Sequence, residues 1–310
     1  MKRILICAAA AIVALASCSK TQVVYNDAPE EIGFKAVTGV MTKAALGESS
    51  NTTMEVAAYL SDGTTYFPET VFEEDGSTNQ WYGETARYWP TEESTVVNFI
   101  AYSPAGDADF TSSSIIIRIP DNKTNQVDWL YSDKIYSGTK ESNKTAGVPV
   151  KLSHALAKVS VNLICATDNV YKFKSLVIND TKQAGTITVT YNVDHDSNPL
   201  TEAVTTCEPS NASGEEELSY TNIAADSYIG DSASAGSVLV FPGAQTSFTL
   251  TYSMEGSAGT FTADIPLEPS KKWEPGKHYT YDVTMTTNQI FVVPSVNGWD
   301  DVSAYPIDVE

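Results

Sequence analysis

The stretch TITVTY at residues 186–191 indicates the fold class, because apolar and polar side chains alternate along it. Ile187, Val189 and Tyr191 share one face of this stretch, and the threonines share the other. Successive side chains of a β-strand point to opposite faces, so the pattern predicts a strand with one buried and one solvated face. The same alternation recurs at residues 115–119, 248–254, 261–267 and 279–285. Strands of this kind are typical of antiparallel β-sandwiches, and we predict an all-β protein.

A glycine-flanked segment poor in apolar residues, at 138–147, separates two strand-rich halves of the chain. Such a composition is typical of a flexible connection. We therefore expect two β-sandwich domains, an N-terminal one at residues 32–148 and a C-terminal one at residues 149–310. Few windows keep a period of 3.6 residues, so we expect few and short helices.

The N-terminus has the pattern of a secretory signal. Two basic residues precede an apolar run at residues 4–15, which is shorter than the roughly 20 residues that span a bilayer as a helix. Residues 15–18, Leu-Ala-Ser-Cys, match the bacterial lipoprotein box, in which the cysteine becomes the acylated first residue of the mature chain. We predict a signal peptide at residues 1–17, a lipid on Cys18 and a polar tether at residues 18–31.

A lipid on Cys18 would fix the protein to a membrane. Each buried methylene of an acyl chain such as palmitate contributes about 0.8 kcal/mol. Ser19 follows the lipid site in place of the aspartate that marks inner-membrane retention in some bacteria. We therefore expect an outer-membrane lipoprotein at the cell surface.

Charge and composition exclude several classes of function. The 310 residues carry 39 acidic and 19 basic side chains, a formal net charge of −20, which repels phosphate backbones and excludes nucleic acid as a partner. The sequence has three histidines and contains no phosphate-binding loop, His-Glu-x-x-His motif or nucleophile elbow. We interpret His154, at the start of an alternating strand, as structural. We expect no catalytic residue, metal or cofactor, and a protein that is not an enzyme.

Two cysteines, Cys165 and Cys207, remain outside the signal and the lipid site. In an exported protein they could form a disulfide. Cys165 also extends the apolar face of residues 159–163, which is typical of a buried thiol. The sequence leaves both alternatives open.

Several segments, in this order, resemble those of the fimbrillin-like lipoproteins, the subunits of type V pili in anaerobic Gram-negative bacteria. They are EIGF at 31–34 with MTKA at 41–44, ARYWP at 86–90 with VNFIAYSP at 97–104, LSHALAKV at 152–159, WEPGKHYTY at 273–281, and residues 293–299. The resemblance implies two transthyretin-like β-sandwich domains. It also implies assembly by strand exchange, in which a protease removes an N-terminal strand and the C-terminal segment of a neighbouring subunit fills the groove. Such an exchange satisfies unpaired backbone groups and buries an apolar groove at once.

The candidate parts for strand exchange lie near the two ends of the chain. The displaceable strand would be residues 32–40, with Lys35 and Lys43 as candidate protease sites, because no arginine lies between Arg3 and Arg87. The donor would be residues 290–302, whose apolar candidates are Ile290, Phe291, Val292, Val293, Val296 and Trp299. The alternative is that this last strand pairs within its own sheet. The absence of arginine leaves stalk, anchor and tip roles open.

The resemblance implies a fimbrial or adhesion subunit of the cell surface. Its partners would be copies of itself or other fimbrial subunits, the outer membrane through the lipid, and a host or bacterial surface receptor. Asp231-Ser232-Ala233 is similar to a short O-glycosylation acceptor of some of these bacteria, which makes Ser232 a candidate for modification. The alternative function is a glycan-binding surface lipoprotein, in which exposed aromatic residues stack on sugars. Its candidate residues are Trp81, Tyr82, Trp129 and Tyr131.

Overall fold

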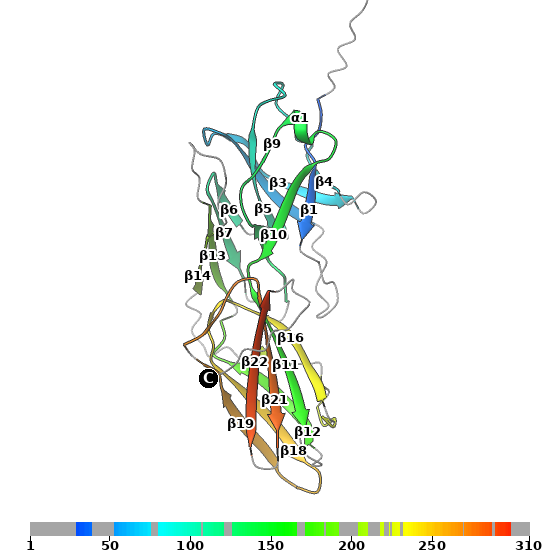
Figure 1. Cartoon of the computed structure of the whole chain (residues 1–310), viewed down its shortest axis with the longest axis vertical. Coiled ribbons are helices and arrows are strands. Elements are labelled where there is room, and N and C mark those ends of the chain that lie inside the picture. The colour runs from blue at the N-terminus through cyan, green and yellow to red at the C-terminus, as the bar shows by residue number, and fades with distance from the viewer. Residues whose placement is uncertain are drawn as a thin grey trace, which may run out of the picture.

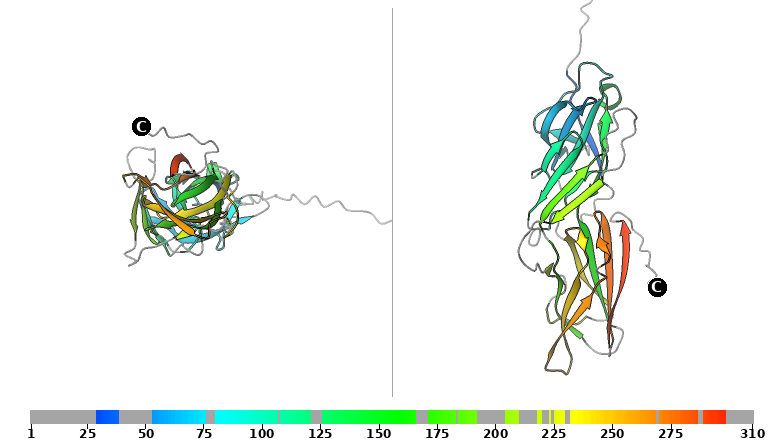
Figure 2. Two further views of the ribbon diagram at one scale, coloured as in Figure 1. Left: turned by 90° about the horizontal axis from the view of Figure 1, so that it is seen from below. Right: turned by 90° about the vertical axis from the view of Figure 1, so that its left-hand side faces the viewer.

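The computed structural model describes residues 29–38, 53–75, 80–106, 108–120, 126–165, 171–182, 184–191, 204–209, 218–219, 223, 225–229, 232–268, 270–286 and 289–298. These residues form β-strands and loops, with one short helix, α1 (Lys140–Asn143). Figure 1 shows an elongated molecule with two bodies stacked along its long axis, and Figure 2 shows the same two bodies from the side. The prediction of an all-β protein is confirmed.

An eight-stranded sheet forms most of the upper body in Figure 1. Its strands follow the order β2-β3-β4-β1-β10-β8-β5-β9, and β2 also pairs with β5, so seven of them close into a ring. Closure leaves those seven strands without a free edge. The strands are β1 (Phe34–Thr38), β2 (Thr53–Leu60), β3 (Thr65–Asp75), β4 (Gln80–Gly83), β5 (Val97–Ser103), β8 (Leu130–Ser132), β9 (Tyr136–Gly138) and β10 (Val148–His154).

A second sheet of the upper body packs against the outside of this ring. Its order is β14-β13-β7-β6, and its strands are β6 (Ala108–Thr111), β7 (Ser114–Ile119), β13 (Gly185–Thr190) and β14 (Val204–Pro209). Ile187 and Val189 of β13 are fully buried in the same core as Ile100 and Tyr102 of the ring. The alternation at residues 186–191 therefore predicted the buried face correctly.

The lower body is a sandwich of two four-stranded sheets, in the orders β16-β11-β21-β22 and β15-β12-β18-β19. Buried apolar residues from both sheets, such as Val161, Leu250 and Val283, form its core. The strands are β11 (Ala157–Cys165), β12 (Tyr171–Asn179), β15 (Leu218–Ser219), β16 (Ser232–Val240), β18 (Ser247–Met254), β19 (Thr260–Pro266), β21 (Lys277–Met285) and β22 (Ile290–Gly298). Two short strands, β17 (Gly243–Ala244) and β20 (Lys272–Trp273), form a separate antiparallel pair. In the sequence, β17 lies between β16 and β18, and β20 lies between β19 and β21.

The pairing of strands differs from the expected antiparallel arrangement in two places. β1 pairs with β10 in parallel, and β11 pairs with β21 in parallel. Parallel partners must be brought together by long connections, so an alternating pattern within each strand does not reveal them.

The structure distributes the chain between the bodies differently from the expected division at residue 148. That division falls inside β10, which pairs with β1 and β8 of the upper ring. β13 and β14, from the expected C-terminal domain, also belong to the upper body because β13 pairs with β7.

The segment at 138–147 forms a tight connection inside the upper body. Thr139 caps α1 by accepting a hydrogen bond from the Ser142 N–H, and Gly147 adopts a φ of 73°. A side chain at Gly147 would also approach the Gly33 oxygen to 3.2 Å, so glycine is needed there for two reasons. Gly138 and Gly147, which suggested a flexible linker, therefore flank a tight connection between β9 and β10.

The two bodies share a buried junction. Ala155 and Leu156 connect β10 to β11, and both are buried in the core that also contains Leu239 and Phe241 from the end of β16. The Ala155 N–H donates to the Trp129 oxygen at 2.7 Å. The connection between the bodies is therefore packed and hydrogen-bonded.

Candidate functional site

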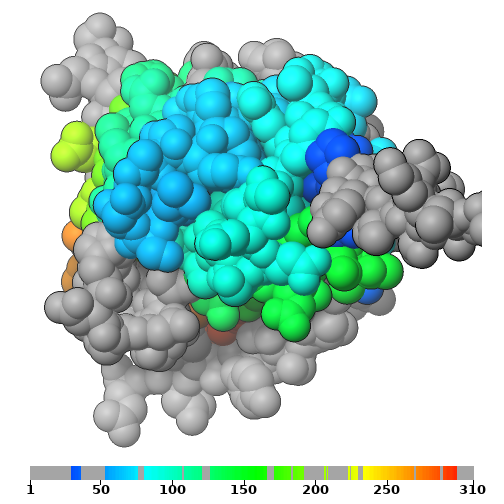
Figure 3. Space-filling view, turned by 90° about the horizontal axis from the view of Figure 1, so that it is seen from above, coloured from blue at the N-terminus to red at the C-terminus, as the bar shows by residue number. Residues whose placement is uncertain are grey.

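The residues that begin the described chain fill a slot in the upper ring. β1 lies between β4 and β10, and the Ile32 N–H donates to the Arg87 oxygen at 2.6 Å. On the other side, the Val148 N–H donates to the Gly33 oxygen at 2.9 Å. Figure 3 shows these residues (blue) at the end of the molecule, bordered by residues of the cyan and green parts of the chain. The N-terminal segment is thus paired along both sides.

Side-chain packing holds the same segment in place. Ile32 and Phe34 are fully buried, and the Phe34 ring contacts Phe72 and Phe99 edge-on, with ring centroids at 4.8 and 5.1 Å. Such edge-to-face pairs add to the stabilisation from burial. The side chain of Lys35 is exposed, as alternation along β1 requires.

Phe34→Ala should lower the free energy of unfolding by about 3–5 kcal/mol, because it leaves a cavity between Phe72 and Phe99. The matched control is Phe291→Ala, at an exposed position of β22, which should change the free energy of unfolding by less than about 1 kcal/mol. Urea denaturation of both variants measures the difference. Equal losses would contradict the assigned burial.

Residues 290–298 of the C-terminal candidate donor form β22, which pairs antiparallel with β21 along its whole length; residues 299–302 lie outside the described residues. The structure therefore describes the alternative in which this strand pairs within its own sheet. β22 is an edge strand, and none of its residues is fully buried. Ile290, Val292 and Val296 pack partly against the lower core, whereas Phe291 and Val293 are 42% and 44% exposed. β22 is apolar on both faces, and three of its side chains, Ile290, Val292 and Val296, hold it at the edge of the sheet.

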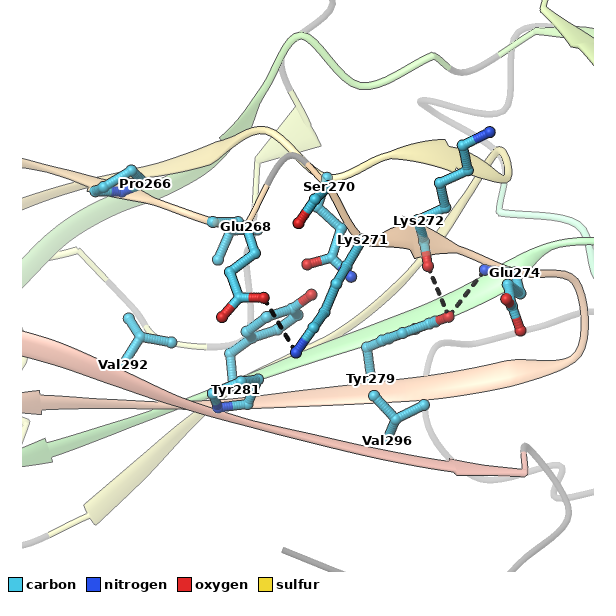
Figure 4. Close-up of a pocket in the computed structure, with 13 residues that line it drawn as sticks. Pro266, Glu268, Ser270, Lys271, Lys272, Glu274, Tyr279, Tyr281, Val292 and Val296 are labelled. Carbon is cyan, nitrogen blue, oxygen red and sulfur yellow. Dashed lines mark hydrogen bonds and ion pairs between the residues drawn. The ribbon is translucent and has the colours of Figure 1, made fainter. Parts of the chain in front are cut away.

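A groove of about 600 Å³ lies between β22 and the end of β19 (Figure 4). Val292 and Val296 line it on the β22 side, and Glu268, Ser270, Lys271 and Lys272 line the opposite side. Tyr279 and Tyr281 of β21 contribute aromatic rings to the same groove. Both β19 and β22 are sheet edges, so the lower sandwich is open along this flank.

Hydrogen bonds engage the polar groups of the groove. The Tyr279 hydroxyl donates to the Lys272 oxygen at 3.0 Å and accepts from the Glu274 N–H at 2.9 Å. Burial raises the pKa values of both groove tyrosines, so they stay neutral. Lys271 pairs with Glu268 at 3.1 Å. These contacts hold the segment from Lys271 to Glu274 against β21. They supply no activated nucleophile or base.

Two histidines have structural environments. His154 Nδ1 lies 2.8 Å from a carboxylate oxygen of Asp128, a partner that the sequence did not indicate. His278 Nε2 lies 2.7 Å from the Ser160 hydroxyl. Burial, with a smaller contribution from Lys158, lowers the pKa of His278 from 6.5 to about 4. His278 is therefore neutral in the folded protein near pH 7.

The lowered pKa of His278 predicts a loss of stability in acid. Between pH 6.5 and pH 4 the unfolded state binds more protons at this site, so the free energy of unfolding falls as the pH drops. After allowance for partial exposure, the loss is about 1–2 kcal/mol. His278→Gln should show a smaller fall between pH 7 and pH 4 than the unchanged protein, measured by urea denaturation. Identical falls would contradict this assignment.

The aromatic residues considered for sugar stacking do not form an exposed pair. Trp81, Trp129 and Tyr131 are buried, and Trp129 stacks on Tyr102 inside the upper core. Only Tyr82 among the four is exposed, at 38%. Burial of three of the four favours the subunit interpretation over a glycan site at these positions.

The remaining predicted residues are placed only in part. Cys18, Lys43 and Trp299 lie outside the described residues, and Ser232 begins β16 with its side chain undescribed. Cys165 ends β11, whereas Cys207 lies in β14 of a different sheet. The groove beside β22 was not predicted, because the sequence does not indicate which strands become sheet edges.

Within the described ranges, no group of three or more His, Cys, Asp or Glu side chains is arranged to hold a metal ion. In the same part of the chain, no helix is long and apolar enough to cross a membrane.

Comparison with known proteins gives consistent matches. A model of the fimbrillin-like family matches residues 21–299. The structure of a fimbrial protein from Bacteroides vulgatus has a TM-score of 0.61 at 15% identity, covering 87% of this chain and 99% of that one. A proposed cell adhesion protein from Bacteroides uniformis has a TM-score of 0.56 at 18% identity, covering 87% and 98%. These identities establish a shared fold alone. No curated protein is similar enough to match.

The matched family and the fold define a structural protein of fimbriae and not an enzyme. More particularly, the chain belongs to the fimbrillin-like family, because the family model covers most of its length. Membership is consistent with a place at the cell surface or in a fimbrium and implies assembly with other fimbrial subunits.

Proposed function

We propose that this chain is a lipid-anchored fimbrial subunit that assembles by β-strand exchange and contributes to adhesion. The observation that carries the proposal is the contrast between its two terminal strands. β1 is buried in a ring, whereas β22 lies half-buried at a sheet edge.

The exposed position of β22 supports its role as the donor. Among the described residues β22 pairs on one side alone, with β21, and its other edge could pair with a strand of another chain. Its detachment would expose the partly buried Ile290, Val292 and Val296. Insertion into a neighbour's groove would bury these side chains again. The donor proposed from the sequence extends to residue 302.

The slot filled by β1 supports its role as the acceptor. Removal of the proposed displaceable strand, residues 32–40, would expose Phe72 and Phe99 and leave β4 and β10 unpaired on one side. An incoming strand would restore both the packing and the backbone pairing.

Of the two candidate protease sites, we favour Lys43. Lys35 pairs with Pro149 within the β1–β10 ladder, so a protease could bind its backbone only after β1 has left the sheet. A cut after Lys43 would free the whole of residues 32–40 at once.

Until a cut after Lys43 separates Cys18 from the rest of the chain, the lipid on Cys18 would hold the protein on the outer membrane. Copies of itself, other fimbrial subunits and a surface receptor are the proposed partners. Ser232 remains a candidate for O-glycosylation. We also propose that the chain forms two transthyretin-like domains with their boundary between His154 and Ala157. β13 and β14, which follow this boundary in the sequence, belong to the N-terminal domain.

Cys18→Ala should move the protein from the outer-membrane fraction to the soluble fraction, because the acyl chains would be lost. Immunoblotting of fractionated cells measures the distribution. Cys165→Ala is the control and should stay in the membrane fraction. Retention of the Cys18 variant in the membrane would contradict the anchor.

Limited trypsin treatment should produce ladders of SDS-resistant, heat-labile oligomers from the unchanged protein. Deletion of residues 290–310 should abolish the ladder because no donor strand remains. Lys43→Gln should suppress the ladder, and Lys35→Gln, at an exposed side chain, should leave it intact. Unheated gel electrophoresis measures the oligomers. A trypsin-treated protein that stays monomeric would contradict strand exchange.

A further inference from the structure

We infer that strands β10 and β11, which we call the spine, carry tension applied between the two ends of the chain, and that this tension shears two parallel strand pairs. The inference gives the proposed anchored subunit a mechanical role, and in that respect it rests on the proposed function. The force response itself is a property of the isolated chain.

The spine is continuous along the molecule. β10 ends at His154 and β11 begins at Ala157, and both strands point the same way along the long axis in Figure 1. The intervening Ala155 and Leu156 are buried, and the Leu156 oxygen accepts a hydrogen bond from the Gly276 N–H at 3.0 Å. The junction therefore joins two strands into one directed element.

Each half of the spine has a parallel partner. β1 pairs with β10 in the upper body, and β21 pairs with β11 in the lower body. Every other strand pair that the structure describes is antiparallel. The two parallel pairs thus lie at successive points on one path from the first strand to β21.

Tension from the N-terminal side loads β1 along its own axis. β1 begins at the outer end of the upper body and points towards the lower body (Figure 1). A pull away from the body therefore loads the ladder to β10 along its whole length, because its evenly spaced hydrogen bonds all link the two strands and share a pull along the strand axis. Ile32 and Phe34 would have to leave their buried positions at the same moment.

Tension from the C-terminal side acts on two strand pairs in different ways: it separates β22 from β21 pair by pair, and it shears β21 against β11. β22 runs back towards the junction and ends at Gly298, opposite Lys277. A pull on Gly298 away from the upper body opens its pairs one at a time. Once β22 is detached, the force acts on Met285 at the far end of β21, and it then shears the ladder between β21 and β11.

The two geometries predict an ordered response to tension. β22 should release at low force, because its pairs break in sequence and its side chains are only half-buried. The two parallel ladders should then hold at much higher force. A subunit pulled through its C-terminal strand would extend by a fixed length and afterwards resist unfolding.

The test is to stretch the chain of residues 18–310 in optical tweezers with handles at its two ends. We expect an early low-force step of roughly 7 nm, from the freed residues 286–298 and the shift of the attachment point to Met285. Two separate high-force ruptures should follow. A chain that first ruptures at high force, without the early step, would overturn the inference.

Three fully buried valines provide a matched test of the path. Val150 lies in β10, Val283 in β21 and Val189 in β13, which is outside the spine and its partners. Val150→Ala and Val283→Ala should each shorten the lifetime under load of a different high-force rupture by about tenfold, because each removes two buried methyl groups. Val189→Ala should change neither lifetime, although thermal unfolding should show a comparable destabilisation. Equal effects from all three variants, or no effect from the first two, would overturn the inference.

Failure of this inference and failure of the proposed function give different results. A chain with the ordered force response that forms no trypsin-dependent oligomers would refute strand exchange alone. A chain that forms oligomers but lacks the ordered response would refute the spine alone.

Discussion

The burial of Ile32 and Phe34 between β4 and β10 is the interaction on which the upper ring depends. β4 and β10 do not pair with each other, so the segment between them supplies backbone partners to both. The aromatic side chain of Phe34 in this segment also contacts Phe72 and Phe99. If this segment were removed, the closed sheet would open between β4 and β10, leaving two free edges and an uncovered apolar interior. The first described strand is therefore an integral part of the core.

The last described strand has the opposite character. β22 adds to the edge of the lower sandwich without closing it, and the groove beside it leaves Val292 and Val296 only partly covered. One chain thus contains a tightly held strand and a loosely held strand. This difference suits an exchange in which β1 leaves only after the chain has been cut. β22, in contrast, can detach from its sheet without any cut in the chain.

The sequence predicted local features of the fold well and long-range pairing poorly. Alternation at residues 186–191 identified a strand and its buried face, because each side chain's direction follows from the backbone alone. The same pattern could not reveal that β13 pairs with β7 of the other half, or that β1 and β10 run in parallel. Apolar residues at 290–293 identified a strand, but the groove beside it depends on where β19 ends, which the sequence did not reveal.

Hydrogen exchange of the intact monomer, resolved to individual strands, tests the central contrast most directly. Amides of β1 should exchange only through global unfolding, because Ile32 and Phe34 anchor that segment in the core. Amides of β22 that pair with β21 should exchange orders of magnitude faster, through local detachment of the edge strand. Equal protection of the two strands, or faster exchange in β1, would contradict the account.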